Sequence, residues 1–420
     1  MPGESASKVG WPLRHLLGFE VALVRALAEH GVAPQAGADA IARACSELEL
    51  DPRSLVDSQL HNATPIPALI DAIRQGVPAE HRRWVHYGAT SQDVIDTGYN
   101  LVFRDDLQRL RVVLLDAAEL MARTATTYRD LVVVGRTLLR RGSWTTLGFR
   151  FACWLDMCLD VVDELDIAVQ SLGLQLGGSS GNLGVLGAIG VPVATSMAAE
   201  LGIPWLGPWQ VNRHQRYRVA FVGVLAARLV DQVAINLLLL SQEELGELTF
   251  GEGDSSSMPN KHNPASVVNA RSAARIALSL GAGMFTAPPV ELERSAGSWQ
   301  AEPDLLTGAL GHAIAAADAL GNSLSGLEVS RASVAANLSD ELYLSETLKV
   351  ALESRFGYDE ARAVMRQILD YSRSKNLPLG SAAHAVVNSD LPTEIATQST
   401  GSLIDQTLVR FQRYRRISNG

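Results

Sequence analysis

Four arginines stand close together in a stretch that carries no acidic residue. Residues 131–155 hold Arg136, Arg140, Arg141 and Arg150 without a single Asp or Glu, although the whole chain has a net charge of -9. A guanidinium can hold a carboxylate through two parallel hydrogen bonds, so this stretch is a candidate anion site. A solvated basic face is the alternative interpretation.

Another candidate, earlier in the chain, is residues 85–97, with the sequence Val-His-Tyr-Gly-Ala-Thr-Ser-Gln-Asp-Val-Ile-Asp-Thr. We call residues 85–97 the first segment, and residues 135–148 of the arginine-rich stretch the second segment. The small hydroxyl and amide side chains of the first segment come just before a long helical pattern. Thr90 or Ser91 could cap that helix, with Asp93 in its first turn. Alternatively, the free N–H groups and hydroxyls at the helix start could bind a carboxylate. We keep both interpretations.

A third segment, residues 253–264, has the sequence Gly-Asp-Ser-Ser-Ser-Met-Pro-Asn-Lys-His-Asn-Pro. Its glycine, serine and proline residues favour a loop, and it falls between two long helical patterns. Composition alone would fit a plain linker. The order and spacing of its residues are far more specific than its composition.

Proline-free stretches indicate the elements that must position these segments. No proline occurs between Pro78 and Pro192 or between Pro208 and Pro259, and these regions are rich in Leu and Ala. Apolar residues recur there at the spacing of one helix face. We therefore predict an all-α fold without a run of alternating strands. The long helices are expected at about residues 100–128, 146–172, 215–247, 264–285 and 303–322.

Composition divides the chain of 420 residues into three expected domains. These are a mixed helical domain at 1–100, a long-helix bundle at 101–345 and a smaller helical domain at 346–420. The helix expected at 215–247 is apolar around most of its circumference, which is typical of a helix inside a bundle. One chain cannot easily cover that surface, so we expect an oligomer.

Overall composition excludes several classes of protein. Hydrophobic residues make up 47% of the chain and charged residues 19%, which excludes global disorder. The acidic net charge argues against a nucleic-acid or anionic-membrane surface. The most apolar stretch, 219–245, is interrupted by Arg228 and Asp231, so we expect no membrane span. The start MPGESASKVGWP lacks an apolar signal region and there are only three cysteines, so we expect reduced thiols and a cytoplasmic location.

The third segment resembles the signature loop of the fumarase/aspartase superfamily. The matching pattern is Ser255-Ser256-x-Met258-Pro259-x-Lys261-x-Asn263-Pro264. The first and second segments are similar to the other two motif regions of that superfamily, in the same order. The resemblance implies a three-domain all-α fold that assembles into a homotetramer with a 20-helix core. It also implies lyase chemistry on a small anionic dicarboxylate or tricarboxylate, without a metal or other cofactor.

Several segments are most similar to one branch of the superfamily. Residues 85–97 resemble the branch that holds adenylosuccinate lyase and 3-carboxy-cis,cis-muconate cycloisomerase. Residues 177–184 (GGSSGNLG), 208–209 (PW) and 297–302 (GSWQAE) resemble the cycloisomerases. Leu138 agrees with them as well, because many of the other lyases have a histidine there.

The resemblance implies that the third segment carries the chemistry. Ser255 would be the base, acting as an alkoxide that takes a proton from a carbon next to a carboxylate. Lys261 would stabilise both the alkoxide and the negative charge that develops. The loop would have to close, because water would protonate an exposed alkoxide, and Gly251 and Gly253 are the expected hinges.

The resemblance also implies a set of substrate-binding residues drawn from all three segments and one further loop. These are Thr90, Ser91, Gln92, Arg136, Thr137, Arg140, Asn212, Ser256, Met258 and Asn263. For Arg136, a structural role at a helix start is an equal alternative. Leu138 cannot transfer a proton, so His86 is the first candidate for a general acid and His214 the second. A leaving group that is itself a good anion would need no acid.

A few positions depart from the superfamily pattern and leave the substrate open. The residues that differ are Arg140, Asn212, His214, Asp254 and His262. One hypothesis is a cycloisomerase that adds a carboxylate across a conjugated double bond. Another is a lyase with a different leaving group, such as a nitrosuccinate or adenylosuccinate lyase.

Two alternatives belong to other classes. A catalytically inactive structural relative is disfavoured because Ser255, Lys261 and Asn263 are all present. A nucleic-acid binder is disfavoured because the basic segments lack interleaved aromatic residues.

Overall fold

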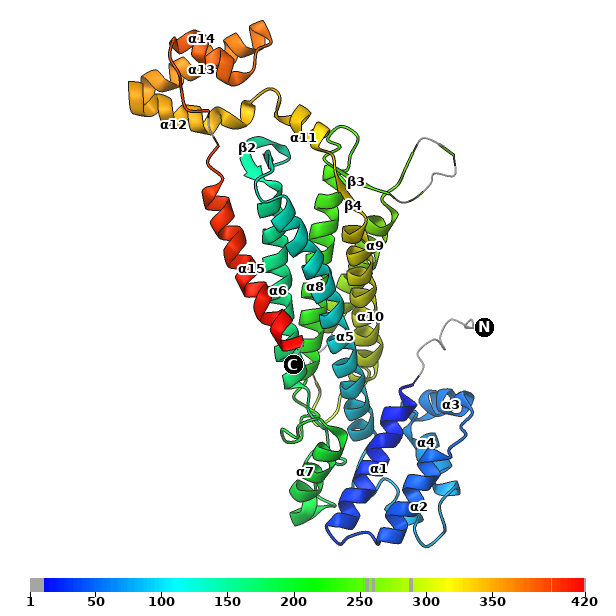
Figure 1. Ribbon diagram of the computed structural model, residues 1–420. Coiled ribbons are helices and arrows are strands. Elements are labelled where there is room, and N and C mark those ends of the chain that lie inside the picture. The colour runs from blue at the N-terminus through cyan, green and yellow to red at the C-terminus, as the bar shows by residue number, and fades with distance from the viewer. Residues whose placement is uncertain are drawn as a thin grey trace. The chain divides into compact units, whose positions relative to one another are not determined.

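The computed structural model describes residues 11–418 apart from 252, 254–256, 259–260, 287–289 and 394. It confirms the all-α prediction, because helices make up most of the described chain (Figure 1). The α-helices are α1 (Leu13–Glu29), α2 (Gln35–Ser46), α3 (Pro52–Asn62), α4 (Ile66–Gln75), α5 (Ser91–Thr127), α6 (Leu147–Ser171), α7 (Gly190–Leu201), α8 (His214–Leu240), α9 (Ala265–Thr286), α10 (Ser298–Ser325), α11 (Arg331–Leu338), α12 (Ser345–Phe356), α13 (Tyr358–Lys375), α14 (Leu379–Val387) and α15 (Gln398–Ser418).

The predicted long helices correspond to α5, α6, α8, α9 and α10. Helix α8 ends at Leu240, earlier than expected, because the chain turns there. The N–H groups of Leu245 and Gly246 both donate to the carbonyl of Gln242, and Gly246 has a positive φ of 56°. Helix α5 begins earlier than expected, at Ser91, so most of the first segment is helical.

Two small antiparallel sheets interrupt the helices. Strands β1 (Val132–Thr137) and β2 (Arg140–Thr146) form a hairpin, and β3 (Leu248–Phe250) pairs with β4 (Leu327–Val329). The sequence contains no run of alternating strands, as predicted, but the hairpin was not predicted. Its two-residue turn consists of Leu138 and Leu139, which lack the Asn-Gly or Asp-Gly signature of such turns.

The chain divides into two compact units. The first comprises Met1–Arg111, Asp163–Ala227 and Arg275–Ile314, and the second comprises Val112–Val162, Arg228–Ala274 and Ala315–Gly420. Every boundary between them falls inside one of the long helices. The division into three domains at 1–100, 101–345 and 346–420 stays a prediction.

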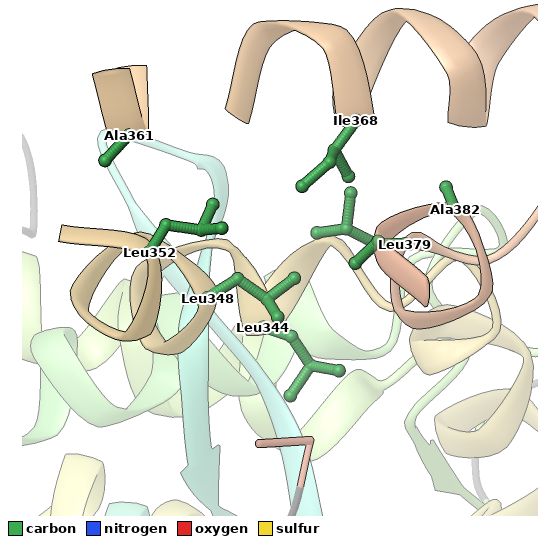
Figure 2. Packing of buried hydrophobic residues seen from close by; sticks show 8 residues of the cluster. Leu344, Leu348, Leu352, Ala361, Ile368, Leu379 and Ala382 are labelled. Atoms are coloured by element: carbon green, nitrogen blue, oxygen red, sulfur yellow. The ribbon is translucent and has the colours of Figure 1, made fainter. Parts of the chain in front are cut away.

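In the second unit, segments of the long helices lie side by side and α15 lies along α6 (Figure 1). The Arg410 guanidinium of α15 donates to Asp156 of α6 at 2.7 Å, and the Arg271 guanidinium of α9 donates to Asp231 of α8 at 3.0 Å. Helices α12, α13 and α14 enclose a core of their own (Figure 2). Its buried residues are Leu344, Leu348, Leu352, Ala361, Ile368, Leu379, Ala382 and Ala383.

Helix α8 is the one described helix that is long and apolar enough to cross a membrane, by length and composition alone. More than half of its most apolar window, 56%, is buried inside the protein. A helix in the interior of a bundle has the same composition and the same burial.

A buried carboxylate fixes the start of α5 in the first unit. Asp93 accepts hydrogen bonds from Gln175 Nε2 at 2.9 Å and from the N–H groups of Gly177 at 3.0 Å, Gly178 at 2.9 Å and Thr90 at 3.0 Å. Burial raises the pKa of Asp93 to about 6, against the effect of these donors. The prediction that Asp93 lies in the first turn of the helix is confirmed. Its carboxylate also caps the helix start by accepting the N–H of Thr90, a role that was expected of Thr90 or Ser91.

We expect Asp93→Asn to lower the free energy of unfolding by about 2–4 kcal/mol. The side-chain NH2 of asparagine would replace one carboxylate oxygen, so the N–H groups that donate to that oxygen would face another donor and lose their acceptor. Denaturant or thermal unfolding at pH 8, where Asp93 is ionised, measures the change. Asp57→Asn on the exposed surface of α3 is the matched control, with an expected change within about 0.5 kcal/mol. Equal changes in the two variants would contradict this role of Asp93.

Candidate functional site

Arg294 holds the first segment in place. This arginine lies in the connection between α9 and α10, and its Nη2 donates to Thr90 Oγ1 at 2.9 Å. Its Nε donates to Gln92 Oε1 at 3.0 Å, and Nη2 also reaches the carbonyl of Ser179 at 3.4 Å. Three loops of the first unit therefore meet at the start of α5.

The charge of Arg294 is not neutralised by any carboxylate of the described chain. Its side chain donates to three neutral oxygens, and its guanidinium lies 6.0 Å from the centre of the Trp299 ring. The side chain is only partly buried. A cation with this environment, beside the hydroxyl of Thr90 and the helix start at Ser91, can attract an anion.

The side-chain amide of Gln92 is hydrogen-bonded to other groups of the protein. Its side chain is fully buried, and its Nε2 donates to Asp96 Oδ2 at 3.1 Å and to the carbonyl of Gln210 at 3.2 Å. Since Oε1 accepts from Arg294, both ends of the amide are occupied by protein groups. Gln92 therefore orients Arg294.

Asp96 in turn anchors Gln92 within a buried network of charges. Arg213 donates to both oxygens of Asp96, at 2.6 Å and 2.9 Å, and also pairs with Glu302. Arg216 lies 3.3 Å from Asp96 Oδ1. Two carboxylates and two guanidinium groups balance here, so these two arginines are structural cations and do not offer free positive charge.

His86 is paired with a buried glutamate. Its Nδ1 lies 2.7 Å from Glu20 Oε1, and Glu20 is almost completely buried. Burial lowers the pKa of His86, but the charge and hydrogen bond of Glu20 outweigh this effect and raise it. The pair stabilises the fold at pH values below about 6.5 and loses that contribution as the pH rises through the raised pKa.

The second segment forms the β1–β2 hairpin. Thr137, Leu138, Leu139 and Arg140 are exposed at its tip, and both leucines have positive φ, 52° and 58°. Such values are unfavourable for residues other than glycine and asparagine. No carboxylate of the described residues pairs with Arg140.

Arg136 lies on β1, and its side chain is largely buried. Its Nη2 lies 3.4 Å from Oε1 of the buried Glu247. The alternative of a structural role at a helix start is wrong, because the residue belongs to a strand.

The third segment is described only in part. Ser255 and Ser256 lie outside the described residues. Met258 and Lys261 are exposed, and the N–H of Lys261 donates to the carbonyl of Met258 at 3.0 Å.

The N–H of Asn263 donates to the carbonyl of Gly253 at 2.7 Å, so a backbone bond closes the base of the third segment. Gly253 has φ of 82°, and a side chain there would place Cβ 2.4 Å from the Asn263 carbonyl. Glycine is therefore required at this close approach.

The predicted residues divide between the two units. His86, Thr90, Ser91, Gln92 and Asn212 belong to the first, whereas the predicted residues of the second and third segments belong to the second. Asn212 has a local role, since its Oδ1 accepts from the N–H of His214 at the start of α8, at 3.2 Å.

Sequence reasoning missed Arg294. The available signal was its position in the sequence, three residues before the 297–302 segment that resembles the cycloisomerases. Among the described residues, no group of three or more His, Cys, Asp and Glu could hold a metal ion.

Comparison with known proteins gives one consistent result. A family model described as lyase matches residues 5–278. A 3-carboxy-cis,cis-muconate cycloisomerase of Pseudomonas aeruginosa is 35% identical, over 84% of this chain and 80% of that protein. A nitrosuccinate lyase of Streptomyces davaonensis is 30% identical, over 97% of this chain and 89% of that protein.

Solved structures agree with these relatives. The 3-carboxy-cis,cis-muconate lactonizing enzyme from Pseudomonas putida superposes with a TM-score of 0.83 and 29% identity, over 96% of this chain and 95% of that one. The motif loop, the all-α fold and these relatives together show that the chain is an enzyme of the fumarase/aspartase superfamily of lyases.

Proposed function

We propose that the enzyme is a cycloisomerase-like lyase acting on a muconate-type polycarboxylate. The observation that carries this proposal is Arg294, a partly buried cation held beside Thr90 by neutral oxygens only. A substrate carboxylate would complete the charge balance at this position. The relatives named as 3-carboxy-cis,cis-muconate cycloisomerases support the substrate class.

In this mechanism Ser255, as an alkoxide, takes the proton from the carbon next to a carboxylate. In the direction that opens a lactone, the electrons of the C–H bond form a C=C bond. The ring C–O bond breaks, and its electron pair leaves on the carboxylate oxygen. Ring closure is the reverse. Lys261 stabilises the alkoxide, and a charge pair about 4 Å apart at an effective dielectric constant near 20 contributes roughly 4 kcal/mol.

The complete site requires more than one copy of the chain in this proposal. Thr90, Ser91 and Arg294 would hold one carboxylate. Thr137 and Asn263 would hold another part of the substrate. Helices α8 and α9 expose large apolar side chains, as expected for surfaces that meet other copies in a homotetramer. These side chains are Phe221, Val268, Ile276 and Phe285.

His86 would supply or receive the second proton where the leaving group needs one. Glu20 keeps its imidazole protonated to a higher pH than usual, which suits a general acid near neutral pH. Leu138 at the hairpin tip offers no titratable group, so His86 is the stronger candidate.

Elimination of nitrite from nitrosuccinate is a second candidate reaction. The nitrosuccinate lyase relative aligns over 97% of this chain, whereas the Pseudomonas aeruginosa cycloisomerase relative aligns over 84%. The same base and the same carboxylate sites would serve, and nitrite would leave as an anion without an acid.

Turnover of candidate substrates tests the proposal directly. We expect ultraviolet absorbance to report opening or closure of a muconate-type diene, and a colour reaction would score nitrite. Ser255→Ala should lower kcat by at least about three orders of magnitude, because the proposal assigns proton abstraction to the Ser255 alkoxide. The variant should keep the size of the wild-type oligomer in solution. Full activity in Ser255→Ala would remove this residue as the base, and failure of every muconate and succinate candidate would reject the reaction class.

Arg294→Met should raise KM for the substrate identified in that screen by about 10- to 100-fold, since a charge-assisted hydrogen bond is lost. Arg294→Lys should restore part of the affinity. Arg366→Met on the exposed surface of α13 removes the same charge and should leave KM unchanged. A KM for Arg294→Met equal to that of the control would contradict the carboxylate contact.

Glu20→Gln should move the alkaline limb of the kcat/KM profile to lower pH, because the pKa of His86 falls when its anionic partner is removed. A purely structural role would lower the rate at every pH and leave the position of the limb unchanged. Steady-state rates across pH 6–9 distinguish the two outcomes.

A further inference from the structure

We propose that a cavity in the second unit binds a small organic monocarboxylate with an apolar body, apart from the chemistry of the serine–lysine loop. The cavity has a volume of about 590 Å³, within the range of ligand pockets. It lies between the β1–β2 hairpin, the first turns of α6 and the end of α8. Its apolar lining consists of Leu139, Phe149, Trp154, Leu239, Leu240 and Leu245.

Two arginines in the cavity wall share one carboxylate. Arg136 Nη2 lies 3.4 Å from Glu247 Oε1, and Arg150 Nη1 lies 3.8 Å from Glu247 Oε2. All three side chains are largely buried. Two positive charges against one negative charge leave an excess of one positive charge where water has little access.

Both arginines also have hydrogen-bond donors without an acceptor. Within the described chain, Arg136 Nε and Arg150 Nη1 are buried and have no hydrogen-bond partner. Burial and the neighbouring Arg136 lower the pKa of Arg150, while Glu247 opposes them. An anion in the cavity would relieve the repulsion between the two guanidinium groups, whose hydrogen-bonding capacity the described protein groups leave partly unfilled.

A carboxylate in the lining of the cavity limits the charge of the ligand. Glu244 also lines the cavity and is exposed to solvent. Its charge disfavours a second negative group near the mouth. The cavity therefore suits one carboxylate on an apolar body, whereas the proposed substrate is a polycarboxylate.

A cysteine reports whether the cavity is occupied. Cys153 lines the cavity and is exposed, whereas Cys45 and Cys158 are buried. Alkylation of the native protein should therefore modify Cys153 first. A ligand in the cavity would slow that reaction.

The probes are 3-phenylpropionate and its neutral analogue 3-phenylpropanamide, used on the intact wild-type protein in low-chloride buffer. We expect the carboxylate to slow N-ethylmaleimide labelling of Cys153, followed by mass spectrometry, at concentrations at least about tenfold lower than the amide. Equal protection by both probes, or none by either, would overturn the proposal. Failure of Cys153 to react without a probe would also overturn it, because the cavity would then be closed in the assembled protein.

Three variants test whether the charged side chains cause the protection of Cys153. Arg150→Met should weaken protection by the carboxylate about tenfold and leave the weak effect of the amide unchanged, while Arg150→Lys should lose less. Glu244→Gln should strengthen protection by the carboxylate. The wild-type comparison of the two probes decides the question even if Arg150→Met fails to fold. Since the readout is binding, it does not depend on which reaction the enzyme catalyses.

Discussion

The candidate site depends on how the carboxylate of Asp96 is buried. Its oxygens accept from Arg213, Arg216, Trp299 and Gln92, so its charge is neutralised and its acceptor sites are filled. Gln92 is thereby fixed with its amide oxygen toward Arg294. The buried carboxylate of Asp96 thus fixes the position of the partly exposed Arg294 guanidinium.

Buried ion pairs rarely add much net stability, because desolvation opposes their attraction. Their value here is geometric. Arg216 lies 4.9 Å from the centre of the Phe103 ring and 5.3 Å from that of Trp209, so aromatic faces hold the part of the guanidinium that has no hydrogen bond. The buried network of Asp96, Arg213, Arg216 and Glu302 at the start of α5 holds Thr90 and Arg294 in fixed positions even without a ligand. Preorganisation of this kind is what stabilisation of a charged transition state requires.

The sequence allowed the long helices and the motif segments to be predicted, because helical periodicity and short motifs are local signals. Contacts between distant residues were not accessible. Glu20 lies 66 positions before His86, and Glu247 lies 111 positions after Arg136. The hairpin was missed because Leu-Leu is an unfavourable turn sequence, and Arg294 was missed because its partners Gln92, Thr90 and Ser179 lie at least 115 positions away along the chain. Ser255, the residue on which the proposed chemistry rests, lies outside the described residues.

The Leu138–Leu139 turn affects the behaviour of the free chain. Left-handed geometry costs roughly 1–2 kcal/mol for each such residue, and the two side chains gain nothing by pointing into water. The tip of the hairpin is therefore both conformationally strained and apolar, and it lowers the solubility of the protein wherever no other surface covers it.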